Sequence, residues 1–279
     1  MATTDQYTVI GSLFPVRPAL RVIGGATDCA VQADAAGVAF KADAAGTITA
    51  NVMIPVLTAT TGCVVGFGDD NVVEYLQFSI DAGLLTAKLY DATANDWTVQ
   101  ADSIEFTAHK WHHIALVQDA LAPVLYVDGV KIAQTMDVST DTTEWGTALG
   151  GLDKGFIGCA NKAGDGSETE EFAGYISDVR VYDAAKTAAE VEAIYKYDAL
   201  GEGSEDTTDQ RNHWKFEVDL LDSGTGADNG TAVGGAIVVD AANEFASKLT
   251  FLNGVAVVGD KVKISISDNL GFAYIIQAA

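Results

Sequence analysis

The most regular hydrophobic pattern of the chain lies in residues 110–133, KWHHIALVQDALAPVLYVDGVKIA. Two runs rich in β-branched and aromatic residues, 111–117 and 124–127, precede the pair Asp128-Gly129. An Asp-Gly pair followed by another β-branched run favours a type I′ turn, because both central positions of that turn need positive φ. The pattern therefore predicts a tight antiparallel hairpin over residues 124–133.

Similar short runs recur along the chain, separated by clusters of Gly, Asn and Asp. Strands spaced roughly every 8–12 residues, with turns between them, are typical of a β-sandwich or barrel. We expect further strands at residues 38–41, 47–56, 63–67, 75–80, 84–90, 97–101, 155–159 and 173–182.

One segment after these strands has the pattern of a helix. Thr187 and Glu190 have the spacing of a capping box, in which each side chain satisfies a backbone amide near the other. Val191, Ile194 and Tyr195 then follow at helical spacing and form one packing stripe. We expect a single short helix that begins after Thr187.

The N-terminal part and a later polar stretch differ from this central region. Residues 1–22 contain Pro15 and Pro18, and proline removes a backbone donor and favours an extended chain before it. We expect an arm that lies along a surface, not a central strand. Residues 199–210 carry four carboxylates and almost no apolar side chain, which predicts a linker.

Residues 211–279 follow this linker and leave two interpretations open. They can form a small separate β unit, or residues 213–218 can be a permuted first strand that completes the main sheet, with an extension behind it. We expect the separate unit, because the remaining strands are enough for a small sheet. These strands are predicted at residues 247–252, 255–258, 261–267 and 272–277.

Three stretches in this order, WHHIALV, LYVDGVKIA and FAGYISDVRVYDAAKTAAEV, resemble the laminin-G-like jelly rolls of the concanavalin A-like lectin/glucanase group. The resemblance covers residues 23–198 and implies an all-β jelly-roll sandwich that ends in one short helix. The later stretch HWKFEVDLL resembles the first strand of such a domain, displaced behind it. The group includes lectins, enzymes, adhesion modules and virion proteins, so the resemblance leaves the function open.

The amino-acid composition and the net charge indicate which classes of binding partner are unfavourable. The chain has 279 residues, of which 48% are hydrophobic, enough to fill a core. Acidic residues outnumber basic ones 39 to 16, giving a formal net charge of −23 that repels nucleic acid and anionic lipid surfaces. No apolar run reaches the ~20 residues of a membrane span, and the first residues lack the pattern of an export signal. We therefore expect neither nucleic acid nor membrane as a partner.

The cysteines predict no disulfide framework. Cys29, Cys63 and Cys159 are odd in number, widely spaced and set in apolar or Gly-rich runs. We expect buried small hydrophobic side chains and folding in a reducing compartment, with a single pair in space left open.

The chain contains one partial match to a catalytic pattern. Glucanases of this fold carry the strand motif E-x-D-x-x-E, and the nearest match here runs from Glu217 through Asp219 to Asp222. Its last acid is shortened to Asp, and it lies outside the domain that would hold a substrate. His112 and His113 point to opposite faces of a strand, so they cannot converge on one proton or metal. We predict no catalytic residues and no enzyme activity.

Two weaker binding sites are predicted. Trp97 and Trp145 lie in polar surroundings and are candidate platforms for a sugar; packing over the rim of the sandwich or against a neighbouring subunit is the alternative. Asp222, Asp228 and Asn229, in the loop DSGTGADN, are candidate calcium ligands, because calcium takes carboxylate and carbonyl oxygens. Such loops are also ordinary turns. We expect no other cofactor.

No sequence motif identifies a reaction, so we base the predicted function on the organisation of the chain. A laminin-G-like domain without an export signal, with an arm and an appended unit, is typical of a protein that folds in the host cytoplasm and joins a particle. We predict a structural protein of a bacteriophage virion, a head-decoration or fibre/spike subunit that forms homo-oligomers, contacts other virion proteins and has a capacity for glycans. The alternative is a carbohydrate-binding or adhesion module of a bacterial surface protein.

Overall fold

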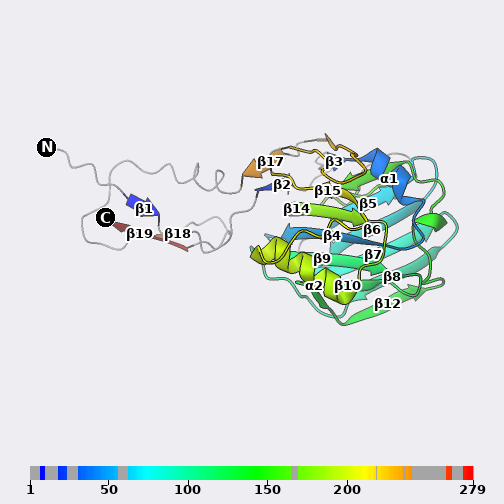
Figure 1. The fold of residues 1–279 in the computed structure, drawn as a ribbon, viewed down its shortest axis with the longest axis horizontal. Coiled ribbons are helices and arrows are strands. Elements are labelled where there is room, and N and C mark those ends of the chain that lie inside the picture. Colours follow the sequence, from blue (N-terminus) through cyan, green and yellow to red (C-terminus); the bar gives the residue numbers. More distant parts are fainter. Residues whose placement is uncertain are drawn as a thin grey trace.

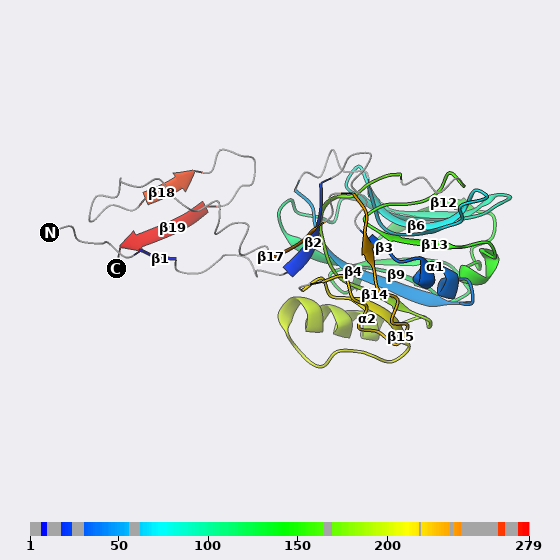
Figure 2. The same ribbon diagram turned by 90° about the horizontal axis from the view of Figure 1, so that it is seen from above.

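A computed structural model describes residues 7–9, 18–23, 31–55, 62–164, 169–217, 219–234, 237–240, 262–265 and 273–278. The main body of the fold is two eight-stranded antiparallel sheets that pack face to face, as Figures 1 and 2 show. The predicted all-β sandwich is therefore confirmed.

The first sheet joins segments from both ends of the sandwich sequence. β15 (Gln210–Trp214) belongs to it through pairing with β14. Its other strands, in spatial order, are β11 (Val130–Lys131), β10 (Val124–Val127), β9 (Trp111–Gln118), β4 (Gly46–Met53), β14 (Ala173–Tyr182), β2 (Pro18–Ile23) and β17 (Ile237–Asp240).

The second sheet contains a continuous antiparallel meander from β5 to β8. The short helical turn η1 (Gly146–Ala148) precedes one of its strands. In spatial order the strands are β12 (Gln134–Ser139), β8 (Asn95–Ala101), β7 (Leu84–Asp91), β6 (Glu74–Asp81), β5 (Gly62–Gly68), β13 (Lys154–Ile157), β3 (Val31–Gln32) and β16 (Thr231–Ala232).

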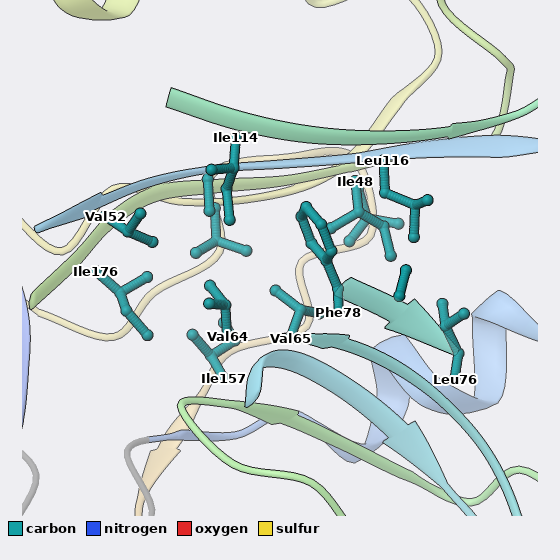
Figure 3. Packing of buried hydrophobic residues seen from close by; sticks show 14 of the residues in the cluster. Ile48, Val52, Val64, Val65, Leu76, Phe78, Ile114, Leu116, Ile157 and Ile176 are labelled. Carbon is teal, nitrogen blue, oxygen red and sulfur yellow. The ribbon is translucent and has the colours of Figure 1, made fainter. Parts of the chain in front are cut away.

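The core lies between the two sheets and follows from strand alternation. Every second residue of a strand points to the same face, so alternate apolar side chains from both sheets meet in the middle. Figure 3 shows Ile114 and Leu116 of β9 above Leu76 and Phe78 of β6, and all four side chains are buried.

The hairpin and the helix are confirmed. Val127 pairs with Val130, and both Asp128 (φ 49°) and Gly129 (φ 77°) have positive φ, as a type I′ turn needs. α2 (Ala188–Tyr195) begins with the predicted capping box, since the Thr187 hydroxyl accepts from the Glu190 amide and the Glu190 carboxylate accepts from the Thr187 amide. Figure 2 shows α2 on the outer side of the first sheet, and Val191 packs there on residues of β9 and β10.

The predicted strand at residues 38–41 is wrong. This segment belongs to a second helix, α1 (Asp34–Phe40), whose Phe40 side chain is buried against Phe67 and Trp145. A Cβ on Gly37 would lie 2.1 Å from the Lys154 carbonyl oxygen, so only glycine permits the close contact of α1 with β13. Burial of Phe40 against side chains distant in sequence outweighs the strand propensity of Val38 and Phe40.

Part of the predicted N-terminal arm is instead a central strand. β2 pairs with β14 on one side and with β17 on the other, and Ala19 and Leu20 are fully buried. Pro18 is tolerated because it is the first residue of the strand, where a missing donor breaks no continuous ladder. Residues 10–17, including Pro15, lie outside the described residues.

The preferred interpretation of residues 211–279 as one separate unit is also wrong. β15 pairs with β14 opposite Val179–Tyr182, β16 pairs with β3 and β17 pairs with β2, so residues up to 240 belong to the sandwich. The permuted-strand alternative is therefore correct for β15. β1 (Tyr7–Val9), β18 (Val262–Ser265) and β19 (Ala273–Ala278) form a separate three-stranded sheet, and the strands predicted at 247–258 lie outside the described residues.

Residues 199–210 do not act as an interdomain linker. After α2 and the π-helical segment η2 (Lys196–Leu200), this stretch packs back on the first sheet through its acids. Glu205 Oε1 lies 2.8 Å from His213 Nδ1, and Asp206 Oδ2 lies 3.0 Å from Lys186 Nζ. The neighbouring Asp198 forms a two-pronged pair with the buried Arg180 of β14. The outer face of the first sheet is therefore covered by α2 and this stretch.

Among the described residues, no helix has the length and apolar character needed to cross a membrane.

Candidate functional site

The outer face of the second sheet carries polar side chains in three rows. In β6, β7 and β8 alternate residues point into the core, so the residues between them point outward. Residues paired directly across antiparallel strands share a face, which aligns the outward residues from strand to strand. The rows are Tyr75, Tyr90 and Asn95; Gln77, Lys88 and Thr98; and Ser79, Thr86 and Gln100. We call these nine residues the polar face.

Backbone from another part of the chain limits the polar face on the β5 side. Gly68 pairs with Tyr75 and Gly66 with Gln77, so both glycines point outward. A Cβ on Gly66 would lie 2.8 Å from the Cys159 carbonyl oxygen, and one on Gly68 would lie 2.2 Å from that of Asn161. Residues 158–162 therefore run directly across β5, and we call them the covering segment.

Two tyrosines and a lysine form the centre of the polar face. The rings of Tyr75 and Tyr90 stack with centroids 5.7 Å apart and planes 10° apart. Lys88 Nζ lies 5.4 Å from the centroid of the first ring and 5.8 Å from that of the second. Tyr75 is buried whereas Tyr90 and Lys88 are partly exposed, so the outer ring and the ammonium group are accessible.

A second charged group reaches this face from the covering segment. Lys162 Nζ pairs with Glu170 Oε1, and Glu170 Oε2 accepts a hydrogen bond from Gln77 Nε2. Gln77 lies directly opposite Lys88 in the middle row. The covering segment is thus joined to the centre of the polar face by a continuous chain of polar contacts.

The β7 and β8 side of the face offers hydroxyl and amide groups. Gln100 Nε2 donates to Thr86 Oγ1 at 3.2 Å, and the side chains of Asn95 and Thr98 are 3.0 Å apart. All four residues are partly exposed. Amides and hydroxyls both donate and accept hydrogen bonds, and a tyrosine ring presents an apolar surface beside them. This combination suits a ligand with an apolar ring face and several hydroxyl groups.

The predicted tryptophan platforms are wrong. Trp97 is 0% exposed and Trp145 is 1% exposed, and their rings stack on each other in the core with centroids 6.3 Å apart. Trp97 shares the inward face of β8 with Val99, and its Nε1 donates to the Glu144 carbonyl oxygen at 2.9 Å. Both side chains belong to the core between the sheets and do not face solvent.

Tyr75, Lys88 and Tyr90 were missed in the sequence. The signal was present in the alternation of the two predicted strands 75–80 and 84–90, in which the inward positions are Leu, Phe, Ile and Ala. The positions between them are the polar face.

Comparison with known proteins identifies the family. The family described as the concanavalin A-like lectin/glucanases superfamily matches residues 25–192, more than half of the chain. The chain belongs to this superfamily. No sequence of a curated protein matches the chain significantly.

A solved structure of a carbohydrate-binding module shows the same fold. The carbohydrate-binding module CBM40 of the Ruminococcus gnavus IT-sialidase is 18% identical, with a TM-score of 0.51, and the likeness covers 63% of this chain and 96% of that module. The same module bound to α2,3 sialyllactose matches with the same values. The heptameric SAP-like pentraxin of Limulus polyphemus is 16% identical with a TM-score of 0.47, covering 83% of this chain and 93% of the pentraxin.

In this superfamily member, the three predicted calcium ligands lie together after β15 but bind protein donors. The two oxygens of Asp222 accept four hydrogen bonds of 2.7–2.8 Å. Asp228 Oδ2 accepts from Asn212 Nδ2 at 2.9 Å, and Asn229 Oδ1 accepts from the Asp222 amide at 3.1 Å. No group of three or more His, Cys, Asp or Glu side chains within the described ranges could hold a metal ion. These contacts make the loop an internally bonded turn, and calcium binding stays a prediction.

The residues weighed for catalysis are not brought together. Glu217 and Asp219 are exposed and follow the end of β15, so they do not share a strand face with Asp222 as the glucanase motif requires. His112 Nδ1 lies 2.9 Å from Asp128 Oδ2, and His112 Nε2 accepts from the Thr107 amide at 2.9 Å. His112 is thus satisfied locally and supports the hairpin turn.

The cysteines differ in part from expectation. Cys159 is disulfide-bonded, and Cys29 lies outside the described residues. Cys63 is free and fully buried, and burial raises the pKa of its thiol to about 12. The disulfide agrees with the single cysteine pair that the sequence left open.

Proposed function

We propose that this protein is a carbohydrate-binding module and that its polar face is the glycan-binding surface. The observation that carries the proposal is the set of three aligned rows, in which a partly exposed Tyr90 ring stands among amide, hydroxyl and ammonium groups. Sugar rings present apolar C–H faces and hydroxyl edges, which match an aromatic ring surrounded by donors and acceptors.

The position of the face also supports this proposal. α2 and the stretch after it cover the outer face of the first sheet, whereas the polar face of the second sheet keeps partly exposed side chains on β7 and β8. The fold it shares with the CBM40 module of a sialidase, whose structure with sialyllactose is known, agrees with this role. We propose binding without catalysis, as expected from the exposed and separated acids Glu217 and Asp219.

The test is binding of the full chain to an array of neutral and acidic glycans, followed by calorimetry with the best ligand. Tyr90→Ala should weaken binding about tenfold or more, because truncation of an aromatic residue at a binding site commonly costs over 1 kcal/mol. The matched control is Tyr197→Ala, which should bind like the wild type. Tyr197 is a partly exposed tyrosine of η2, which contacts the first sheet, whereas the polar face belongs to the second. Equal affinity of the Tyr90→Ala variant and the wild type would exclude this face.

The location of the protein, on a bacterial surface or in a virion, is a separate question from its ligand. The disulfide at Cys159 supports a bacterial surface or secreted protein over one that stays in a reducing cytoplasm. The virion role predicted from the sequence, with its homo-oligomers, virion partners and assembly in the host cytoplasm, stays a prediction. Co-sedimentation of the protein with phage particles would favour the virion role, and its recovery on the bacterial surface would favour the module.

A further inference from the structure

Lys88 stands at the centre of the polar face, where no carboxylate of the described residues pairs with it. It occupies the middle row between Gln77 and Thr98, and its ammonium group contacts the two stacked tyrosine rings. None of the ion pairs among the described residues includes Lys88. This is notable in a chain with a formal net charge of −23, where carboxylates greatly outnumber ammonium groups. The positive charge is therefore available to a ligand.

A second ammonium group lies close enough to interact with Lys88. Lys162 belongs to the covering segment and contacts Glu170, which accepts from Gln77 directly opposite Lys88. Burial, followed by the positive charge of Lys88, lowers the pKa of Lys162. Lys162 is already paired with Glu170, so Lys88 is the ammonium group of this face that is left for an acid group of a ligand.

The acidity of the whole chain does not prevent local attraction of an anion. At physiological ionic strength the Debye length is about 8 Å, so exposed carboxylates beyond that distance are largely screened. A ligand group in contact with Lys88 experiences mainly the nearest charges. A charge-assisted hydrogen bond from an ammonium group to a carboxylate is also roughly twice as strong as a neutral one.

We propose that the polar face selects a glycan with an anionic sugar residue, whose acid group binds Lys88 while its ring lies on Tyr90. This inference rests on the proposed glycan-binding function and adds the class of sugar. Thr98, the partly exposed neighbour of Lys88 in the middle row, is placed to bond a hydroxyl group on the same residue. The acid group is a carboxylate or a sulfate ester, since an ammonium group binds both.

The test compares acids with neutral esters of the same sugars. Calorimetry on the full chain would use 3′-sialyllactose and trigalacturonic acid, the methyl ester of each, and lactose, with 6′-sulfolactose as the sulfate probe. At least one acid should bind about tenfold or more tightly than its neutral counterpart. Lys88→Met should remove most of that preference, whereas Lys88→Arg should keep it. Lys131→Met, at an exposed position of β11, is the control and should keep it too.

The outcomes separate this inference from the function on which it rests. If neutral glycans bind as tightly as the acids, the anionic inference fails and the glycan-binding function stands. If no glycan on the array binds the wild type, both fail. A preference for acids that survives in a folded Lys88→Met variant, checked by its melting temperature, would overturn the assignment to Lys88. Tighter binding of 6′-sulfolactose than of either carboxylate would support the inference and identify sulfate as the source of charge.

Discussion

At the scale of single residues, Asp96 on β8 is a carboxyl group in an unfavourable environment. It is 5% exposed, and Asp91, Asp141 and Glu144 are the nearby acids. Burial, followed by repulsion from these carboxylates, raises the pKa of Asp96 from 3.8 to about 6. The folded state therefore binds the Asp96 proton more tightly than the unfolded state does. The resulting stabilisation is fully present below about pH 4 and is lost as the pH rises through about 6.

Asp96→Asn should stabilise the protein at neutral pH. The amide cannot ionise, so the variant should gain about 1–2 kcal/mol in the free energy of unfolding at pH 7 and little at pH 4. Urea denaturation at both pH values would measure this difference. Asp137→Asn, at an exposed position of β12, should change stability by less than about 0.5 kcal/mol at either pH. An equal gain at pH 4 and pH 7 would show that charge is not the cause.

Single residues also show what local sequence could and could not reveal about the site. Trp97 alternates with Val99 and Ala101, so the strand pattern was sufficient to place it on the inward face. Trp145 had no such signal, because its burial depends on Phe40 of α1, which is distant in sequence. The same alternation that buries Trp97 would have identified Lys88 and Tyr90 as outward residues.

At the scale of elements, the β10–β11 turn depends both on the positive φ of Gly129 and on the packing of this residue against α2. Gly129 has φ 77°, and a Cβ at this position would lie 2.9 Å from Cδ1 of Tyr195 and 3.2 Å from the Glu192 Cα. The turn therefore contacts α2, and the capping box that starts α2 indirectly supports the hairpin. Local sequence predicted both elements because each is specified by short-range chemistry: positive φ in the turn and reciprocal caps at the helix.

Gly129→Val should destabilise the protein for both reasons. A β-branched residue is strained at positive φ, and its side chain would collide with Tyr195, so we expect a loss of about 1–3 kcal/mol in the free energy of unfolding. Thermal and urea denaturation would measure it. Val130→Thr, one residue later and exposed, keeps a β-branched side chain and should be nearly neutral. An unchanged melting temperature for Gly129→Val would contradict the turn assignment.

The element at residues 34–40 shows where local pattern fails. Its alanines and single valine are compatible with strand or helix, and the choice is made by Phe40 inserting beside Phe67 and Trp145. Those contacts connect three segments far apart in the chain. A sequence window around residue 38 contains neither Phe67 nor Trp145, so it cannot reveal these contacts.

At the scale of the whole molecule, one edge of β14 is completed by two segments from opposite ends of the sandwich sequence. β2 pairs with Ala173–Ile176 and β15 pairs with Val179–Tyr182 on the same edge, while β4 occupies the other edge. The fold class was predictable from alternation and turns. This shared edge was not, because pairing between strands so distant in sequence leaves no local signal, and Pro18 suggested an arm instead of a strand.

This arrangement decides which fragments of the chain can fold. A fragment of residues 23–198 lacks most of β2 and all of β15 and β17, so one edge of β14 would stay unpaired. It also lacks the buried side chains of Leu20, Trp214 and Phe216, and therefore exposes part of the core. Unpaired edges and exposed apolar surface both promote aggregation. A fragment of residues 18–240 keeps every strand of both large sheets, and the described residues that it omits are those of the three-stranded sheet.

We expect residues 18–240 to be a soluble monomer that melts cooperatively and residues 23–198 to be aggregated or molten. Size-exclusion chromatography and near-UV circular dichroism would distinguish the two states. Adding a peptide of residues 199–240 to the short fragment should restore part of its near-UV signal, because β15 and Trp214 would return to the edge of β14. The same peptide with Trp214→Ala is the control and should restore less. A cooperatively melting monomer of residues 23–198 alone would mean that β2 and β15 are accessory to the sandwich, contrary to their buried position in it.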